Sequence, residues 1–99
     1  MRHATKAARA AEAVRLEDIP NVGPSIAADL RRIGVERPEQ LKGQEPLALY
    51  ERSCLAAGVR QDPCLLDVYT AAVRFMEGGP ALPWWAFSAL RKAGREGRP

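Results

Sequence analysis

Leu16-Glu-Asp-Ile-Pro-Asn-Val-Gly-Pro-Ser-Ile-Ala-Ala-Asp-Leu-Arg-Arg-Ile-Gly34 is the stretch that decides the fold of this chain. A proline suits the first position of a helix, where its missing N–H would have had no partner, and a glycine is a common stop. Between these signals the apolar residues Ile26, Leu30 and Ile33 recur at helical spacing. The stretch therefore predicts a tight turn at Pro20–Ser25 that leads into a helix.

The predicted turn is suited to binding an anion. A glycine lets a ligand approach the backbone closely, and the first amides of a helix are unpaired and lie at the positive end of its dipole. The residue at 24 is a proline without an N–H, so the available donors are the amides of Gly23, Ser25 and Ile26, together with the Ser25 hydroxyl. Arg32 shares the outer stripe of this helix with Ser25, and Asp29, three residues before Arg32, partly neutralises it.

This stretch resembles the helix-hairpin-helix motif, whose usual hairpin reads Pro-Gly-hydrophobic-Gly. Asn21 stands where the first glycine of the motif lies, and asparagine tolerates left-handed backbone better than other non-glycine residues. The resemblance places Asn21 in the predicted phosphate-binding set with the three amides and Arg32. It implies an all-α fold of the SAM-like or helix-hairpin-helix type.

Composition agrees with a helical domain. The chain has 99 residues, of which 46% are hydrophobic and only 6% aromatic, which is enough for one domain with a modest core. Alanine and leucine dominate the apolar residues, and both favour helices. We expect a compact bundle of about five short helices. No window approaches the roughly 20 apolar residues that span a bilayer, and no secretory signal is evident, so we expect a cytoplasmic protein without membrane contact.

The net charge of +3 is unevenly distributed along the chain. Residues 1–15 carry +3 and residues 88–99 carry +3, whereas residues 16–87 hold seven basic and ten acidic residues and sum to −3. We expect a basic N-terminal helix or arm over 1–15 and a helix-hairpin-helix domain over 16–78. Residues 79–99 are expected to form a helix with two tryptophans and a basic disordered tail from Gly94, packed on the same single domain.

The N-terminal segment carries a candidate auxiliary site. It is rich in alanine and predicts a helix from Thr5 to about Arg15. On such a helix Arg2, Lys6 and Arg9 form one basic stripe, which is either a solvated face or an auxiliary phosphate-binding surface.

The strongest amphipathic pattern follows Asp62, which can cap a helix that begins at Pro63 and ends at Gly78-Gly79-Pro80. Its predicted core stripe consists of Leu65, Val68, Tyr69, Ala72, Phe75 and Met76. One order of elements occurs twice along the chain: a helix, a Gly-Val turn, a proline and a further helix. The two turns lie at Gly34 and Gly58, and the repeat indicates stacked helical hairpins.

Two cysteines and one histidine, His3, do not make a zinc-ligand set or a disulfide scaffold, so we expect no metal and two reduced thiols. Cys64 lies second in its predicted helix, where the dipole lowers the pKa of a thiol, but the neighbouring Asp62 opposes this. Cys64 is therefore either a reactive thiol, alone or with Cys54, or a small core residue.

Trp84 and Trp85 cannot both face one core, because adjacent helical positions point about 100° apart. We expect one to plug the bundle. The other is either half-exposed or marks the surface that binds a protein partner or a second copy of the chain, since tryptophan is enriched at such sites.

Several short motifs in a fixed order resemble the small bacterial pathogenicity locus family, whose members are sometimes labelled mitomycin-resistance proteins. They are the hairpin, Asp-Leu-Arg-Arg-Ile-Gly at 29–34, Leu49-Tyr50, Cys54, Asp62-Pro63-Cys64-Leu65-Leu66 and Trp84-Trp85. The resemblance implies a helix-hairpin-helix fold and, by analogy with other such modules, sequence-independent contact with DNA.

Two functions follow from these observations. The leading hypothesis is a non-enzymatic module that binds DNA phosphates through the hairpin, and its alternative is a protein-interaction adaptor that uses the Trp84/Trp85 surface. The −3 balance of residues 16–87 favours the adaptor, whereas the hairpin chemistry favours DNA. We expect no enzyme and no cofactor, because no nucleophile with a base, carboxylate pair or phosphate loop is recognisable.

Overall fold

The computed structural model describes residues 6–96, with side chains described as far as residue 93. Its four α-helices are α1 (Pro24–Arg32), α2 (Pro46–Ala57), α3 (Pro63–Met76) and α4 (Trp84–Glu96). Three short 3-10 helices precede or join them: η1 (Ala10–Glu12), η2 (Leu16–Asp18) and η3 (Pro38–Leu41). This described part contains no strand, which confirms the all-α expectation, with four α-helices in place of about five. No helix in it is long and apolar enough to cross a membrane.

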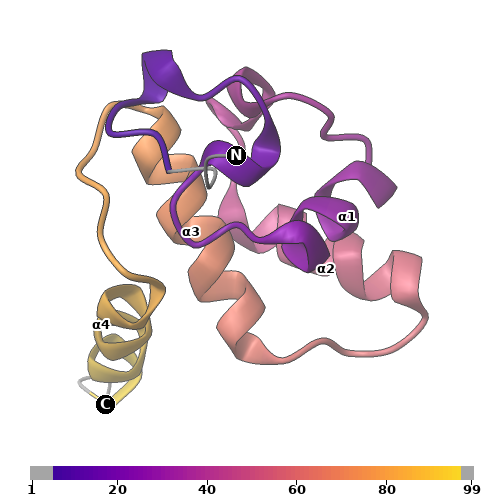
Figure 1. Cartoon of the computed structure of the whole chain (residues 1–99). Coiled ribbons are helices and arrows are strands. Elements are labelled where there is room, and N and C mark those ends of the chain that lie inside the picture. The colour runs from indigo at the N-terminus through magenta and orange to yellow at the C-terminus, as the bar shows by residue number, and fades with distance from the viewer. Residues whose placement is uncertain (1–5, 97–99) are drawn as a thin grey trace.

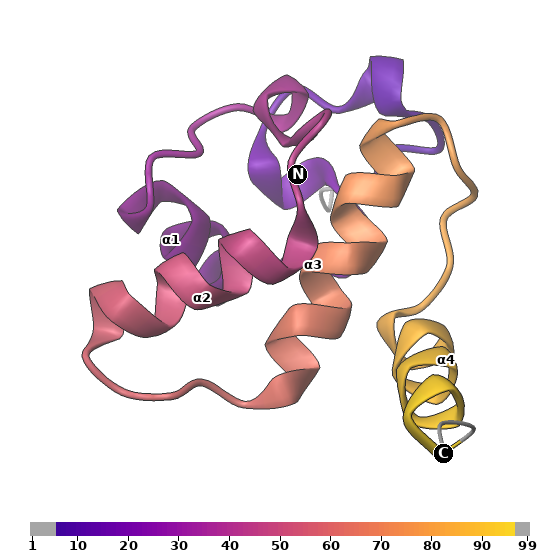
Figure 2. The same ribbon diagram turned by 180° about the vertical axis from the view of Figure 1, so that it is seen from behind.

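The helix α3 lies at the centre of the molecule, with α1 and α2 on one side and α4 on the other (Figure 1, Figure 2). Its start is fixed as predicted, because Asp62 Oδ1 accepts a hydrogen bond of 2.8 Å from the backbone N–H of Cys64. All six residues of the predicted core stripe are buried, which confirms α3 as the core helix.

The two Gly-Val turns have the same backbone geometry. Gly34 and Gly58 both adopt left-handed φ angles, 94° and 72°, which glycine tolerates without strain. In each turn the valine N–H reaches back to the preceding helix, from Val35 to the Leu30 carbonyl and from Val59 to the Cys54 carbonyl. The likeness ends there. The first turn leads to the four-residue η3 and the second to the fourteen-residue α3.

The N-terminal segment is not the predicted helix. Residues 6–15 contain the single turn η1, and the rest of the segment is extended or bent. Alanine propensity is overridden here because carboxylates and carbonyls elsewhere take up the backbone amides. The Ala7 N–H donates to the Asp18 carbonyl at 2.8 Å, and the N–H groups of Val14 and Arg15 donate to the Asp18 carboxylate. The proposed stripe therefore does not exist as a helical face, and Arg2 lies outside the described residues.

The helix α4 packs mainly against α3. Phe87 is buried, and the Arg91 guanidinium binds both carboxylate oxygens of Asp67 at 2.9 and 3.0 Å. The helix continues to Glu96, so the expected disordered tail from Gly94 is wrong for its first three residues. Residues 97–99 lie outside the described part of the chain.

Candidate nucleic-acid interface at the hairpin

Fully buried side chains anchor the hairpin to the hydrophobic core. Leu16 in η2, then Ile19 and Val22 in the turn, have no exposed surface, and the Val22 N–H donates to the Ile19 carbonyl at 3.0 Å. The segment before the turn is the three-residue η2, so the first helix of the expected motif is a single 3-10 turn. Because these apolar residues face inward, the backbone from Gly23 to Ser25 is presented at the surface.

The first amides of α1 are unpaired, as expected. The first hydrogen bond of the helix runs from the Ala27 N–H to the Gly23 carbonyl at 2.9 Å, and no side chain caps the helix. Within residues 6–96 the amides of Gly23, Ser25 and Ile26 have no acceptor. The φ of Gly23 is −93°, and a Cβ there would have no neighbour within 4 Å, so the fold does not require a glycine at this position.

Asn21 adopts the left-handed conformation with a φ of 73°, which confirms the expectation for its backbone. Its side chain, however, is not available to a phosphate. The Asn21 Nδ2 group donates to the Leu82 carbonyl at 2.8 Å, and the Trp84 N–H at the start of α4 donates to Asn21 Oδ1 at 3.3 Å. The prediction that Asn21 contributes to the phosphate site is therefore corrected for its side chain, because that amide joins the hairpin to α4.

The basic side chains nearest the hairpin are mostly paired with acids. Arg32 contacts Asp29 at 2.9 Å, which confirms the predicted neutralisation, and Arg31 binds both carboxylate oxygens of Glu17. Both arginines are exposed, so these pairs stabilise the fold little. They do reduce the net positive charge at the exposed surface of α1.

Lys6 is brought to the hairpin in a way that the sequence did not indicate. Its ammonium donates to the carbonyls of Glu17 and Val22, each at 2.6 Å, and so bridges η2 and the turn. Burial lowers the pKa of Lys6, and the charges of Asp18 and Glu17 act in the opposite direction. Arg9 instead faces solvent and lies 3.6 Å from Glu12, so these two cations do not form one stripe.

The two tryptophans differ in exposure, but neither fills the core as expected for one of them. Trp84 is half-buried and lines a cleft of about 350 Å³ together with Ile26 of α1, whereas Trp85 is 61% exposed. Their rings meet edge to face with 5.8 Å between the centroids. The hairpin and the tryptophan pair are therefore adjacent surfaces.

A family model described as the Cdd1 pathogenicity locus matches residues 9–93 of the chain. The chain belongs to the pathogenicity locus family. The mitomycin resistance protein McrB of Streptomyces lavendulae is 47% identical over 77 residues, which cover 78% of this chain and 73% of that relative. No solved structure matches the chain. The family resemblance drawn from the hairpin and the tryptophan pair is thus confirmed.

In this member of the pathogenicity locus family both cysteines are free and half-buried. A hydrogen bond with Asp62 raises the pKa of the Cys64 thiol, and burial raises it further. A raised pKa weakens the interpretation of Cys64 as a reactive thiolate. Among the residues described, no group of three or more His, Cys, Asp or Glu side chains is placed to hold a metal ion.

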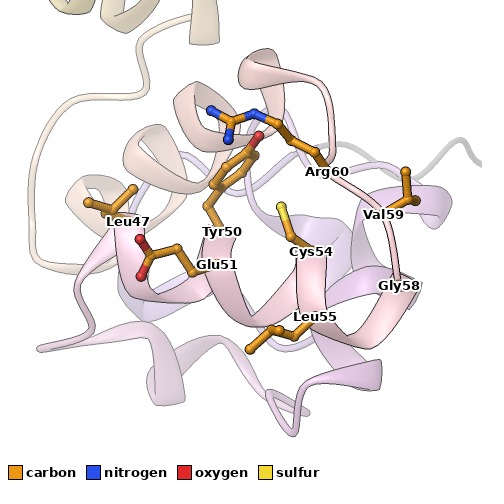
Figure 3. A pocket seen from close by; sticks show the side chains of 8 residues that line it. All are labelled: Leu47, Tyr50, Glu51, Cys54, Leu55, Gly58, Val59 and Arg60. Carbon is orange, nitrogen blue, oxygen red and sulfur yellow. The ribbon is translucent and has the colours of Figure 1, made fainter.

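A larger cleft, of about 670 Å³, lies along α2 and was not anticipated from the sequence (Figure 3). Tyr50 and Cys54 form its floor, and the Tyr50 hydroxyl donates to the Gln61 carbonyl. Its rim carries three exposed aliphatic side chains, Leu47, Leu55 and Val59.

Proposed function

We propose that this chain is a non-enzymatic helix-hairpin-helix module that binds DNA through its phosphates, independently of sequence. The observation that carries this proposal is the group of three unpaired amides at Gly23, Ser25 and Ile26, at a turn that has an exposed Ser25 and that buried side chains anchor. A phosphate oxygen would accept hydrogen bonds from these amides and from the Ser25 hydroxyl at the positive end of the α1 dipole.

Gly23 supports the same proposal. Neither its φ nor its neighbours require a glycine, and a side chain at this position would project into open space. We therefore infer that the glycine serves ligand binding and not the fold. Without a Cβ at this position, a bulky anion such as a phosphodiester can reach the amides.

Lys6 adds a positive charge next to the site. Its ammonium binds the Val22 carbonyl, one residue before Gly23, and so places a positive charge directly beneath the turn. An anion bound at the turn would be attracted by this charge.

The test measures binding of the whole chain to labelled duplex and single-stranded DNA by fluorescence anisotropy at low salt, where phosphate contacts contribute most. Ser25→Glu sets a carboxylate where the phosphate would lie, and we expect it to weaken binding to every DNA sequence alike. The substitution suits the first turn of a helix, so it does not destabilise α1.

Ala28→Glu is the matched control, because Ala28 is exposed one turn further along the same face of α1. It adds the same charge away from the free amides and is expected to reduce affinity much less than Ser25→Glu. Equal binding by the wild type and Ser25→Glu would refute the proposal, and so would equal losses in the two variants.

A second candidate function is a protein-interaction adaptor, and the exposure of Trp85 favours it. If Trp85 is the centre of a partner surface, Trp85→Ala should weaken association by about 2 kcal/mol or more. Leu82→Ala, at a less exposed aliphatic side chain just before α4, serves as the control. Unchanged capture of bound partners by Trp85→Ala would count against the adaptor.

A further inference from the structure

The helix α2 carries large apolar side chains on its outer face as well as on its inner face. Its inner face buries Leu49 and Tyr50 in the core. Its outer face exposes Leu47 by 50% and Leu55 by 82% of their surface. The outer side of a surface helix normally carries charged and polar residues, whereas on α2 two leucines are exposed beside Glu51.

The turn after α2 extends this apolar surface. Val35 and Val59 occupy equivalent positions in the two Gly-Val turns, but Val35 is 2% exposed and Val59 is 62% exposed. The first valine is covered within the chain and the second is not. Val59, Leu55 and Leu47 all line the 670 Å³ cleft on α2.

The rim of this cleft also carries one acid and one base. Glu51 lies on the α2 wall with Leu55, and Arg60 lies on the opposite wall with Val59 (Figure 3). Both charged side chains belong to exposed residues, and within the described residues neither has an ion-pair partner within 4 Å. We call these four residues, together with Leu47, the α2 face.

We propose that the α2 face binds a second copy of this chain about a two-fold axis that runs along the cleft. Such an axis sets the α2 wall of each copy against the Val59–Arg60 wall of the other. Leu55 then meets Val59 of the second copy, and Glu51 meets Arg60 of the second copy. These contacts occur twice in the dimer, so Glu51 and Arg60 each meet an opposite charge, and Leu55 and Val59 each meet an apolar side chain.

The charge pattern selects a second copy over an unrelated partner. A face with an acid on one wall and a base on the other is self-complementary under a two-fold rotation. Contiguous exposed apolar surface of this kind marks interaction sites in soluble proteins. The proposal is independent of DNA binding, since it uses none of the residues of the hairpin.

The first test is a concentration series of the whole chain by sedimentation velocity, from about 1 µM to about 500 µM, since self-association depends on protomer concentration. We expect a monomer–dimer equilibrium in this range. Leu55→Glu should raise the dimer dissociation constant by about 100-fold or more, the effect of a central contact. Leu90→Glu, at another exposed leucine that lies on α4 and is 68% exposed, should leave the dimer dissociation constant unchanged.

The second test is a charge reversal. Glu51→Arg and Arg60→Glu should each weaken the dimer by about 10-fold, and the double variant should recover most of the loss because the pairs are restored with opposite sign. The proposal is overturned if the wild type stays monomeric throughout the series, if Leu55→Glu dimerises as the wild type does, or if the double variant shows no recovery.

Discussion

Replacement of Arg91 by leucine tests how α4, which carries Trp85, is held on the domain. The side chain of Asp67 is 2% exposed and that of Arg91 is 24% exposed, and two hydrogen bonds of 2.9 and 3.0 Å join them. Arg91→Leu leaves the Asp67 carboxylate buried without a counter-charge. An uncompensated buried charge of this kind costs about 3–5 kcal/mol of unfolding free energy.

The double variant Asp67→Leu/Arg91→Leu removes both charges, so no carboxylate is left buried. Replacing a buried ion pair by apolar residues of similar volume is often close to neutral. We therefore expect the double variant to be more stable than Arg91→Leu alone by about 2 kcal/mol or more, a difference of about 10 °C or more in Tm for a domain of this size.

The assay is thermal and urea unfolding followed by far-ultraviolet circular dichroism, with hydrogen exchange of α4 amides as a local readout. We expect the α4 amides of Arg91→Leu to exchange faster than those of the wild type, because this ion pair joins α4 to α3. A double variant no more stable than Arg91→Leu would refute the reasoning. The loss of unfolding free energy in Arg91→Leu would then not come from the unpaired, buried Asp67 carboxylate.

Three further predictions concern the hairpin and the thiols. Asn21→Ala and Asn21→Gly both lose the hydrogen bonds to Leu82 and Trp84, but the alanine must also adopt a φ of 73°. Urea unfolding should therefore show that the alanine variant is about 0.5–1 kcal/mol less stable than the glycine variant. Equal stabilities of the two variants would contradict this. Because Asp62 raises the pKa of Cys64, its alkylation by iodoacetamide should follow a pH profile shifted above that of an unfolded cysteine, and a profile shifted below it would be inconsistent. Intact mass of the chain purified without added oxidant should show Cys54 and Cys64 reduced, and a stoichiometric intramolecular disulfide would disprove this.

The parts of the fold that were predictable are those with local signals. Asp62 followed by Pro63 sets the start of α3, and the apolar spacing from Leu65 onward sets its buried face. Asn21 in the turn indicated its left-handed backbone, because few other residues accept that conformation. These signals act over a few residues, so the sequence alone carries them.

The parts that were missed depend on contacts between distant residues. Alanine-rich residues 6–15 favour a helix in isolation, but Asp18 and the carbonyls bound by Lys6 hold them in another conformation. Asn21 finds its acceptor 61 residues away at Leu82, and Asp67 finds Arg91 24 residues away. No local pattern reports such pairs. The open outer face of α2 was missed for a different reason, because its apolar residues have the composition of a core helix.

The central claim, that the hairpin amides hold a DNA phosphate, is tested most directly by nuclear magnetic resonance of the uniformly ¹⁵N-labelled chain during titration with a short DNA duplex. The three donors are backbone N–H groups, so each reports its own hydrogen bond as a change in amide chemical shift. We predict that the largest shifts arise at Gly23, Ser25 and Ile26 and that added salt reverses them. Shifts confined to the indole and amide signals of Trp84 and Trp85, or no shifts at low salt, would contradict the claim.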